Sequence, residues 1–314
     1  MSLPPPDLDA AVAHLRGGGL VAFPTETVYG LGARARDPLA VRQIFAMKGR
    51  PADHPLIVHL AEASWLSRWA RLDGPLGSLA GPLAAAHWPG PLTLILPRAD
   101  GVPDEVTGGL DTVGLRVPGH PLARALIAAV GEGVAAPSAN RFGCVSPTTA
   151  AHVRAELGPT LWVLDGGACT VGVESTILDL SGEVPALLRP GGVSLAALEA
   201  VAGPVQRGGR TRAPGTLASH YAPRTALILT DDVDGERARH EARGLRVATL
   251  AAGEPQEHAR RLYAELRRLD LTGVDVLVAE RAAPGGLGDA INDRLTRAAH
   301  EHPPSTLNPT SDRG

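Results

Sequence analysis

The alternation of apolar and polar residues divides the chain into two parts. In the first part, apolar positions at helical spacing predict one helix capped by Asp7 and a second that begins at Asp37 and Pro38 and ends at Lys48. Further helices are predicted over residues 121–130 and 148–157. Short apolar runs predict the strands LVAF, PLIVHL, LTLILP, TVGLRVP, LWVLD, STILDL and PALLRP. These elements indicate one α/β domain over residues 1–204.

The second part has a more regular pattern. The predicted strands TALILT, RVATL and VDVLVAE alternate with three helical segments, an order typical of a small parallel sheet over residues 225–300. Residues 205–224 between the two parts are rich in Gly, Arg and Pro and have no period, which predicts a linker or an ordered crossing loop. The last residues, 301–314, are polar and are predicted to be disordered.

Composition limits the classes of function. A net charge of −3 and 3% aromatic residues argue against a protein that holds nucleic acid by counterion release and base stacking. The two cysteines, Cys144 and Cys169, are too few for a disulfide scaffold or a thiolate zinc site. Because no apolar stretch is long enough to span a membrane, we expect a cytoplasmic protein that makes no membrane contact.

Lys48 is the only lysine in a chain whose other basic residues are all arginine. This bias indicates a position that needs a compact ammonium group, although chance survival of one lysine is an equal alternative. Lys48 and Arg50 are separated by one glycine at the end of a predicted helix, so both could converge on one polyphosphate. The alternative is a solvated helix end.

Other polar residues follow or interrupt predicted strands. Ser138 and Asn140 come after an apolar strand start, where α/β sheets bind ligands, and an ordinary turn is the alternative. Arg116 lies inside a strand that is predicted to be buried, so it must face a carboxylate from the protein or from a substrate. His59 ends another apolar strand. With Asp53 and His54 it forms only a weak metal pattern, and we predict no protein-held metal.

The sequence has no phosphate-binding loop of the G-x-x-x-x-G-K-[ST] type and no well-placed G-x-G-x-x-G. It does contain PTETVYGLG, KGR, PLIVH, SAN, ESTI and RPG in this order, followed by HYAP and GLGDAINDRLTRAA. Together these segments resemble the YrdC-like threonylcarbamoyl-AMP synthase family in its long form, which has an added C-terminal domain. The resemblance implies a twisted mixed sheet with a concave, positively charged surface, followed by a small Rossmann-like parallel domain.

The resemblance also implies an activity and a set of site residues. The activity is L-threonylcarbamoyladenylate synthesis, a nucleotidyl transfer from ATP to the carbamate of L-threonine and bicarbonate. The product would pass to the machinery that transfers threonylcarbamoyl to tRNA, and Mg²⁺ would arrive with ATP. The implied catalytic residues are Lys48, Arg50, Ser138 and Asn140. The implied ATP site consists of Arg50, His54, Thr112, Ser138, Ser146, Arg189 and Tyr221, and the threonine site of Thr27, His59, Arg116 and Ser175.

Three further expectations remain open. His54 stands where the family often has Asn. The segment over residues 205–224 would be a lid that delivers Tyr221 to the site, whereas a passive tether is the default for such a composition. The alternatives to the synthase are an RNA-binding module, a non-synthase YrdC-like paralogue, and a carbamoyl-adenylate domain of hydrogenase maturation, which carries zinc-binding C-x-x-C segments that this sequence lacks.

Overall fold

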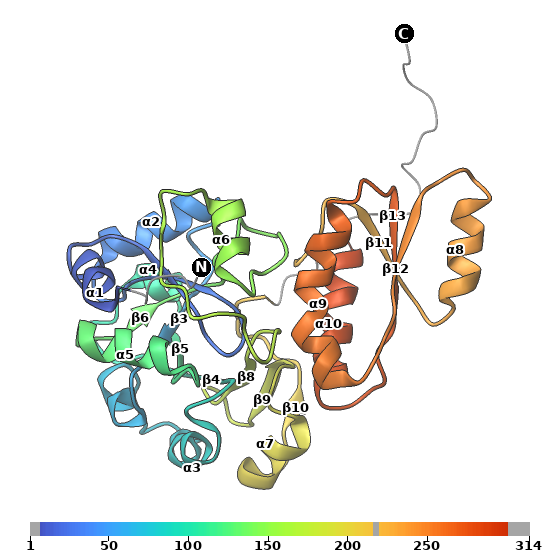
Figure 1. The fold of residues 1–314 in the computed structure, drawn as a ribbon. Helices are drawn as coiled ribbons and strands as arrows, with labels where there is room; N and C mark the ends of the chain where they lie inside the picture. The colour runs from blue at the N-terminus through green and yellow to red at the C-terminus, as the bar shows by residue number, and fades with distance from the viewer. Residues whose placement is uncertain (1–6, 216–219, 301–314) are drawn as a thin grey trace.

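The computed structural model describes residues 7–215 and 220–300. The tail predicted to be disordered lies outside these residues, as does part of the predicted linker, residues 216–219. Figure 1 shows a large α/β domain joined to a smaller one, and each domain has its own sheet. Among the described residues, no helix is both long and apolar enough to cross a membrane.

The first domain is built on a mixed sheet in the order β10-β9-β8-β4-β5-β3-β6-β2-β1-β7. Its strands are β1 (Val21–Phe23), β2 (Gly30–Arg34), β3 (Ile57–His59), β4 (Leu92–Pro97), β5 (Thr112–Arg116), β6 (Val134–Ala135), β7 (Trp162–Val163), β8 (Thr176–Asp179), β9 (Ala186–Arg189) and β10 (Gln206–Arg207). Parallel and antiparallel pairs occur in the same sheet. The mixed sheet predicted for this part is therefore confirmed.

The helices of the first domain surround this sheet (Figure 1). They are α1 (Leu8–Arg16), α2 (Pro38–Lys48), the 3-10 helix η1 (Ala63–Arg68), α3 (Gly77–His87), α4 (Asp104–Thr107), α5 (Pro121–Val130), α6 (Ala150–Leu157) and α7 (Leu195–Ala202). The caps agree with the sequence. Asp37 accepts hydrogen bonds from the backbone N–H groups of Leu39 and Ala40, and Gly49 ends α2 in the left-handed conformation, at φ 62°.

Several elements were not predicted, and β2 shows why. The segment GLGAR has two glycines and no β-branched residue, so its composition does not favour a strand. A Cβ atom at Gly32 would lie 2.7 Å from the ring of Phe23 and 2.9 Å from Val134, which shows that the glycine allows close packing of neighbouring side chains. The helix α3 was missed as well, because Gly77, Gly81 and Pro82 interrupt its pattern.

The C-terminal domain alternates strands and helices as predicted: β11 (Ala226–Thr230), α8 (Val233–Glu241), β12 (Val247–Leu250), α9 (Pro255–Asp270), β13 (Val276–Glu280) and α10 (Leu287–Ala299). Its three strands are parallel, in the order β11-β13-β12. The small parallel sheet is thus confirmed. Figure 1 shows α9 and α10 on the side that faces the first domain and α8 on the far side.

The two domains share buried contacts. One apolar cluster joins the core of the C-terminal domain to Val28, Val145 and Val173 of the first domain and to Tyr221 of the intervening segment. Within that segment, β10 pairs in parallel with β9 and extends the large sheet by one edge strand. The ends of segment 205–224 are therefore held by both domains.

Candidate active site

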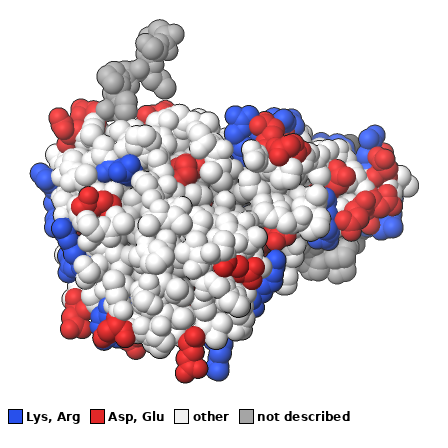
Figure 2. All heavy atoms as spheres, turned by 90° about the horizontal axis from the view of Figure 1, so that it is seen from below, with Lys and Arg blue, Asp and Glu red and all other residues white. Residues whose placement is uncertain are grey.

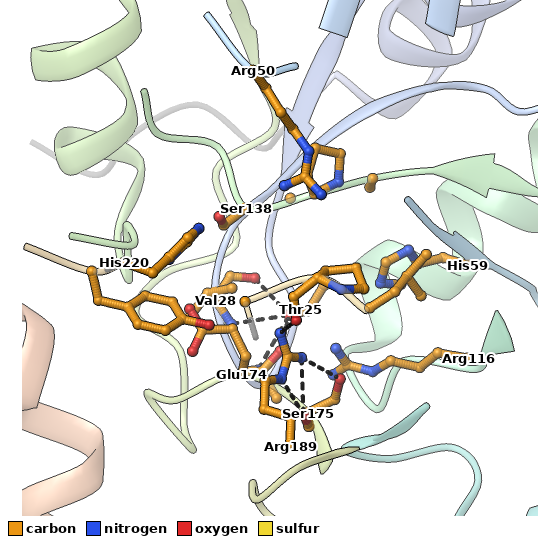
Figure 3. A pocket seen from close by; sticks show the side chains of 18 residues that line it. Thr25, Val28, Arg50, His59, Arg116, Ser138, Glu174, Ser175, Arg189 and His220 are labelled. Carbon is orange, nitrogen blue, oxygen red and sulfur yellow. Dashed lines mark hydrogen bonds between the residues drawn. The ribbon is translucent and has the colours of Figure 1, made fainter. Parts of the chain in front are cut away.

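A buried cavity lies where the ends of several strands of the first domain meet the segment between the domains (Figure 3). His59 at the end of β3 and Arg116 at the end of β5 are direct partners in a parallel pair, so the sheet brings them to the same edge. The loop after β1, the loop after β6 and the turn before β8 close the remaining sides. The cavity is lined by Thr25, Thr27, Val28, Gly30, Arg50, Ile57, His59, Arg116, Ala136, Pro137, Ser138, Glu174, Ser175, Arg189, Pro214, Gly215, His220 and Tyr221.

Arg116 has the carboxylate partner that its burial requires. Its Nη2 atom donates to Oε1 of Glu26 at 2.6 Å, and its Nε atom donates to the carbonyl oxygen of Gly90 at 3.2 Å. The other carboxylate oxygen of Glu26 accepts the backbone N–H of Gly119 at 2.8 Å. The partner thus comes from the protein, and within the described part of the chain Nη1 of Arg116 makes no hydrogen bond and remains for a ligand.

Arg189 and Arg50 are held differently, by carbonyl oxygens. The Nε and Nη2 atoms of Arg189 donate to the carbonyl oxygen of Ser175 at 3.1 and 2.9 Å, and Nη1 donates to that of Pro214 at 2.8 Å. Nη2 of Arg50 donates to the carbonyl oxygen of Pro55 at 2.9 Å. Burial lowers the pKa of Arg50 to about 10, which leaves the group charged at neutral pH. A carbonyl satisfies an N–H without cancelling its charge, so both arginines keep a positive charge for an anion.

The hydrogen bonds of Thr25, Thr27 and Ser175 fix which of their hydroxyl groups donate and which accept. The hydroxyl of Thr25 donates its single proton to the carbonyl oxygen of Val28 at 2.6 Å. Its 2.8 Å contact with the hydroxyl of Thr27 must therefore have Thr27 as the donor. The oxygen of Thr27 is left as an acceptor on the cavity wall. Ser175 accepts from Nη2 of Arg189 at 3.1 Å.

Lys48 does not line the cavity. Its Nζ atom donates to the carbonyl oxygens of Ser138 at 2.6 Å and Asn140 at 2.5 Å, and the residue is 3% exposed. Burial, followed by the charge of Arg50, lowers the pKa of Lys48 to about 7. The lysine therefore fastens the turn that carries Ser138, and Ser138 itself reaches the cavity. Asn140 is also buried outside the cavity wall, and its side-chain N–H groups hold the carbonyls of Arg141 and Cys144.

Comparison with known proteins shows to which family the chain belongs. The Sua5_yciO_yrdC family model, described as "Telomere recombination", matches residues 13–191. A second model, described as "Threonylcarbamoyl-AMP synthase, C-terminal domain", matches residues 193–300. The chain belongs to the Sua5/YciO/YrdC family. The resemblance found in the sequence, including the added C-terminal domain, is thereby confirmed.

Several similar proteins match nearly the whole length of the chain. The threonylcarbamoyl-AMP synthase of Pyrococcus abyssi is 42% identical over 321 residues, which cover 92% of this chain and 93% of the relative. The threonylcarbamoyl-AMP synthase of Bacillus subtilis is 41% identical, with 94% and 93% covered. The crystal structure of P. abyssi Sua5 complexed with L-threonine superposes with a TM-score of 0.88 at 41% identity, and 93% and 94% of the two chains are covered.

Cavity residues of this Sua5/YciO/YrdC member carry unpaired polar atoms. Within the described ranges, buried side-chain atoms without a hydrogen-bond partner include Nε of Arg50, Nδ1 of His59, Nδ1 of His220 and the hydroxyl of Tyr221. Burial lowers the pKa of His59 and of His220 to about 3, so both imidazoles are neutral at physiological pH. Such a concentration of unpaired polar atoms around one cavity is typical of a site that a polar ligand completes.

Some predicted site residues lie outside the cavity. His54 lines a neighbouring outer cavity that shares Arg50, Gly215 and His220 with the first one, and its ring contacts Phe142 edge to face at 5.3 Å. Thr112 lines a third cavity, which shares Ile57 and Pro214 with the first one. Ser146 is fully buried and donates to Oε1 of Glu174 at 2.5 Å. The structure therefore brings Thr27, Arg50, His59, Arg116, Ser138, Ser175, Arg189 and Tyr221 together, but not Lys48, His54, Thr112, Asn140 or Ser146.

Sequence reasoning missed four residues that line the cavity or hold one of its lining residues in place. Glu26, which holds Arg116, belongs to the PTETVYGLG segment. Glu174, on the cavity wall, directly precedes the strand predicted as STILDL. Thr25 orders the loop after β1, and His220 precedes Tyr221. A carboxylate next to an apolar strand was the available signal for Glu174, because a buried charge requires a partner.

The position of Tyr221 differs from that of a side chain on an exposed lid. It is 1% exposed, belongs to the apolar cluster of the C-terminal domain, and has a backbone φ of 65°, unusual for a residue with a bulky side chain. A Cβ atom at Gly215 would lie 2.1 Å from its hydroxyl, so only glycine lets the chain pass so close to it. Tyr221 is thus a fixed part of the cavity wall.

Proposed function

We propose that this protein catalyses the formation of L-threonylcarbamoyl-AMP from L-threonine, bicarbonate and ATP. The observation that carries the proposal is a cavity lined by three buried arginines, two of which are held by carbonyl oxygens and keep their charge for an anion. The relatives named threonylcarbamoyl-AMP synthase, which match over more than nine-tenths of the chain, support the same activity. The reaction class would be nucleotidyl transfer.

Threonine would bind at the Arg116 end of the cavity. The free Nη1 atom of Arg116 can pair with the carboxylate, while Glu26 keeps the guanidinium in place. The oxygen of Thr27 is an acceptor, so it can receive the hydroxyl proton of threonine. His59 and Ser175 would border the same end. The solved relative that contains L-threonine supports a threonine site within this fold.

ATP would bind with its phosphates toward Arg50, Arg189 and Ser138, with Tyr221 beside them. The outer cavity with His54 and Phe142 would then receive the nucleoside. Glu26 and Glu174 are each held by an arginine. Magnesium would therefore enter as part of the MgATP substrate, with phosphate oxygens and water as its ligands.

The reaction needs no covalent enzyme intermediate. The amine of threonine attacks the carbon of bicarbonate, and loss of water gives the N-carboxylate, a carbamate. A carbamate oxygen then attacks the α-phosphorus of ATP, and pyrophosphate leaves with the electrons of the bond between the α-phosphorus and the bridging oxygen. The protein would contribute positioning and fixed positive charge from Arg50 and Arg189. Enclosure matters because both the carbamate and the mixed anhydride are labile in water.

The product is an activated acyl-adenylate, and we infer that a tRNA threonylcarbamoyl-transfer system consumes it. The alternative function, RNA binding, would require a broad basic surface. On the face shown in Figure 2, charged residues of both signs lie around the edges of a mostly uncharged centre. That face offers no basic stripe on which RNA could lie.

The test is pyrophosphate release from ATP by the purified full-length chain. We expect release that requires both L-threonine and bicarbonate, with threonylcarbamoyl-AMP identified by mass spectrometry. Release that is independent of threonine would refute the proposed activity. Tight RNA binding without turnover would instead support the RNA-binding alternative.

A further inference from the structure

Two oppositely charged, buried residues lie where the two domains meet. Glu174 of the first domain is 6% exposed and lines the cavity, and Arg294 of α10 in the C-terminal domain is 1% exposed. The Nε atom of Arg294 donates to Oε2 of Glu174 at 2.9 Å. Tyr263 of α9 donates its hydroxyl proton to the same oxygen at 2.8 Å, and Ser146 donates to Oε1 at 2.5 Å. We call Glu174, Arg294, Tyr263 and Ser146 the boundary cluster.

The cluster keeps the carboxylate of Glu174 ionised. Burial alone would raise the pKa of Glu174, but the charges of Arg294 and Arg189 and the hydrogen bonds to the carboxylate lower it to about 2. A negative charge therefore stands on the wall of a cavity whose proposed substrate is a polyanion. This negative charge is offset by an ion pair with Arg294, which belongs to the other domain and is absent from the residues that line the cavity.

Arg189 is the cavity cation that this carboxylate could neutralise. Both residues line the cavity, and each affects the pKa of the other. Within the described part of the chain, all the hydrogen-bond acceptors of Arg189 are oxygens of Ser175 and Pro214, and no carboxylate lies within salt-bridge distance. If Arg294 were lost, Arg189 would be the cation with the largest remaining effect on Glu174, and the charge that Arg189 offers to a phosphate would be reduced.

We propose that Arg294 of the C-terminal domain is a positioning residue for ATP, because it holds Glu174 and thereby leaves the charge of Arg189 free for the phosphates. Tyr263 assists by donating to the same carboxylate. The proposal rests on the proposed function, since it takes MgATP as the ligand of the cavity. It assigns a role to the C-terminal domain: this domain completes the electrostatics of a site whose lining residues all precede it.

Arg294 also borders Tyr221. The guanidinium carbon of Arg294 lies 5.3 Å from the centre of the Tyr221 ring, and Nη1 donates to the carbonyl oxygen of Pro190 at 2.9 Å, directly after Arg189. One side chain of the C-terminal domain therefore contacts the segments that carry Glu174, Arg189 and Tyr221. Its replacement should affect Arg189, which would bind phosphate, and leave the ion pair of Arg116 with Glu26 unchanged.

The test measures KM for MgATP and KM for L-threonine separately in the full-length protein. For Arg294→Met we expect KM for MgATP to rise about tenfold or more, with KM for threonine within about threefold of the wild type. The double variant Glu174→Gln/Arg294→Met removes both charges, so its KM for MgATP should return to within about threefold of the wild-type value. Arg207→Met is the matched control: it removes another ion pair to α10, with Asp289, away from the cavity.

The outcomes separate a positioning role from a structural one. If Arg294→Met binds MgATP as well as the wild type, or if the double variant is as impaired as the single one, the proposal is wrong. Should Arg294→Met fail to fold, Tyr263→Phe takes its place. A rise of about threefold in KM for MgATP is then expected, and an unchanged value overturns the proposal. Calorimetric titration with MgATP keeps the test independent of turnover, so failure of the synthase assay would refute the proposed function without deciding the role of Arg294.

Discussion

Replacement of Lys48 tests whether the single lysine acts through the turn that it holds. Its Nζ atom binds the carbonyl oxygens of Ser138 and Asn140, and the residue is buried at the end of α2. In Lys48→Met both hydrogen bonds are lost. The carbonyl of Ser138 keeps a second donor, the backbone N–H of Asn140 at 3.0 Å, whereas no other donor to the carbonyl of Asn140 is found in the described part of the chain.

The expected loss follows from these contacts. Lys48→Met leaves the buried carbonyl of Asn140 without a donor, and an unsatisfied buried acceptor costs about 1–3 kcal/mol, so the free energy of unfolding should fall by about 1–3 kcal/mol. Lys48→Arg keeps the charge but adds volume to a packed site, for an expected loss of about 1–3 kcal/mol. Both variants should lose about 10²-fold in turnover, because the turn that places Ser138 is displaced.

The assays are denaturant unfolding and threonine-dependent pyrophosphate release. Arg42→Met is the control, since Arg42 lies on the same helix but forms an exposed pair with Glu105, and its loss should change stability by less than about 0.5 kcal/mol. If Lys48→Met unfolds within about 1 kcal/mol of the wild type and keeps full turnover, the turn does not depend on Lys48.

Three further predictions concern selectivity, pH and the segment between the domains. Valine should react about 10²-fold or more slowly than threonine, because it leaves the oxygen of Thr27 without a donor, and serine should be less impaired; equal kcat/KM for valine would show that the hydroxyl is not recognised. His59 and His220 have folded pKa values of about 3, below the unfolded value of 6.5, so the unfolded chain binds more protons between these limits. The free energy of unfolding should therefore fall as pH decreases from about 6.5 toward 3, and a flat profile in denaturant titrations would contradict the burial of these imidazoles. If residues 205–224 act as a lid, MgATP should protect residues 207–212 from trypsin, whereas cleavage unaffected by MgATP would indicate a tether. Tyr221→Phe should lower turnover while the fold is kept. Tyr221→Ala is unsuitable because this buried ring supports the C-terminal domain.

The sequence predicted the strands and helices whose apolar pattern is local. The parallel C-terminal sheet, α2 with its Asp37 cap and α5 all follow from spacing within a single element. The strand β2 could not be predicted in this way. Its two glycines are favourable only because Phe23 and Val134 pack over Gly32, and that contact exists only after the sheet has formed.

The cavity was predictable to a similar degree. Arg116 could be recognised as a buried charge in need of a carboxylate, but its partner Glu26 lies 90 residues away along the chain. Glu174 and Arg294 are 120 residues apart and belong to different domains. No local pattern pairs residues at such separations. The uniqueness of Lys48 indicated a special position, but it could not distinguish a contact with phosphate from a contact with two backbone carbonyls.

The three cavity arginines differ in how far their charge is compensated. Arg116 is paired with Glu26, so the pair is close to neutral before a ligand binds. Arg50 and Arg189 are held by carbonyl oxygens, which supply hydrogen bonds without negative charge, so both stay positive. A zwitterionic amino acid suits the compensated arginine and a triphosphate suits the two uncompensated ones. Because the charge of Arg189 depends on Arg294 to offset Glu174, binding of ATP should respond to changes in the C-terminal domain more strongly than binding of threonine does.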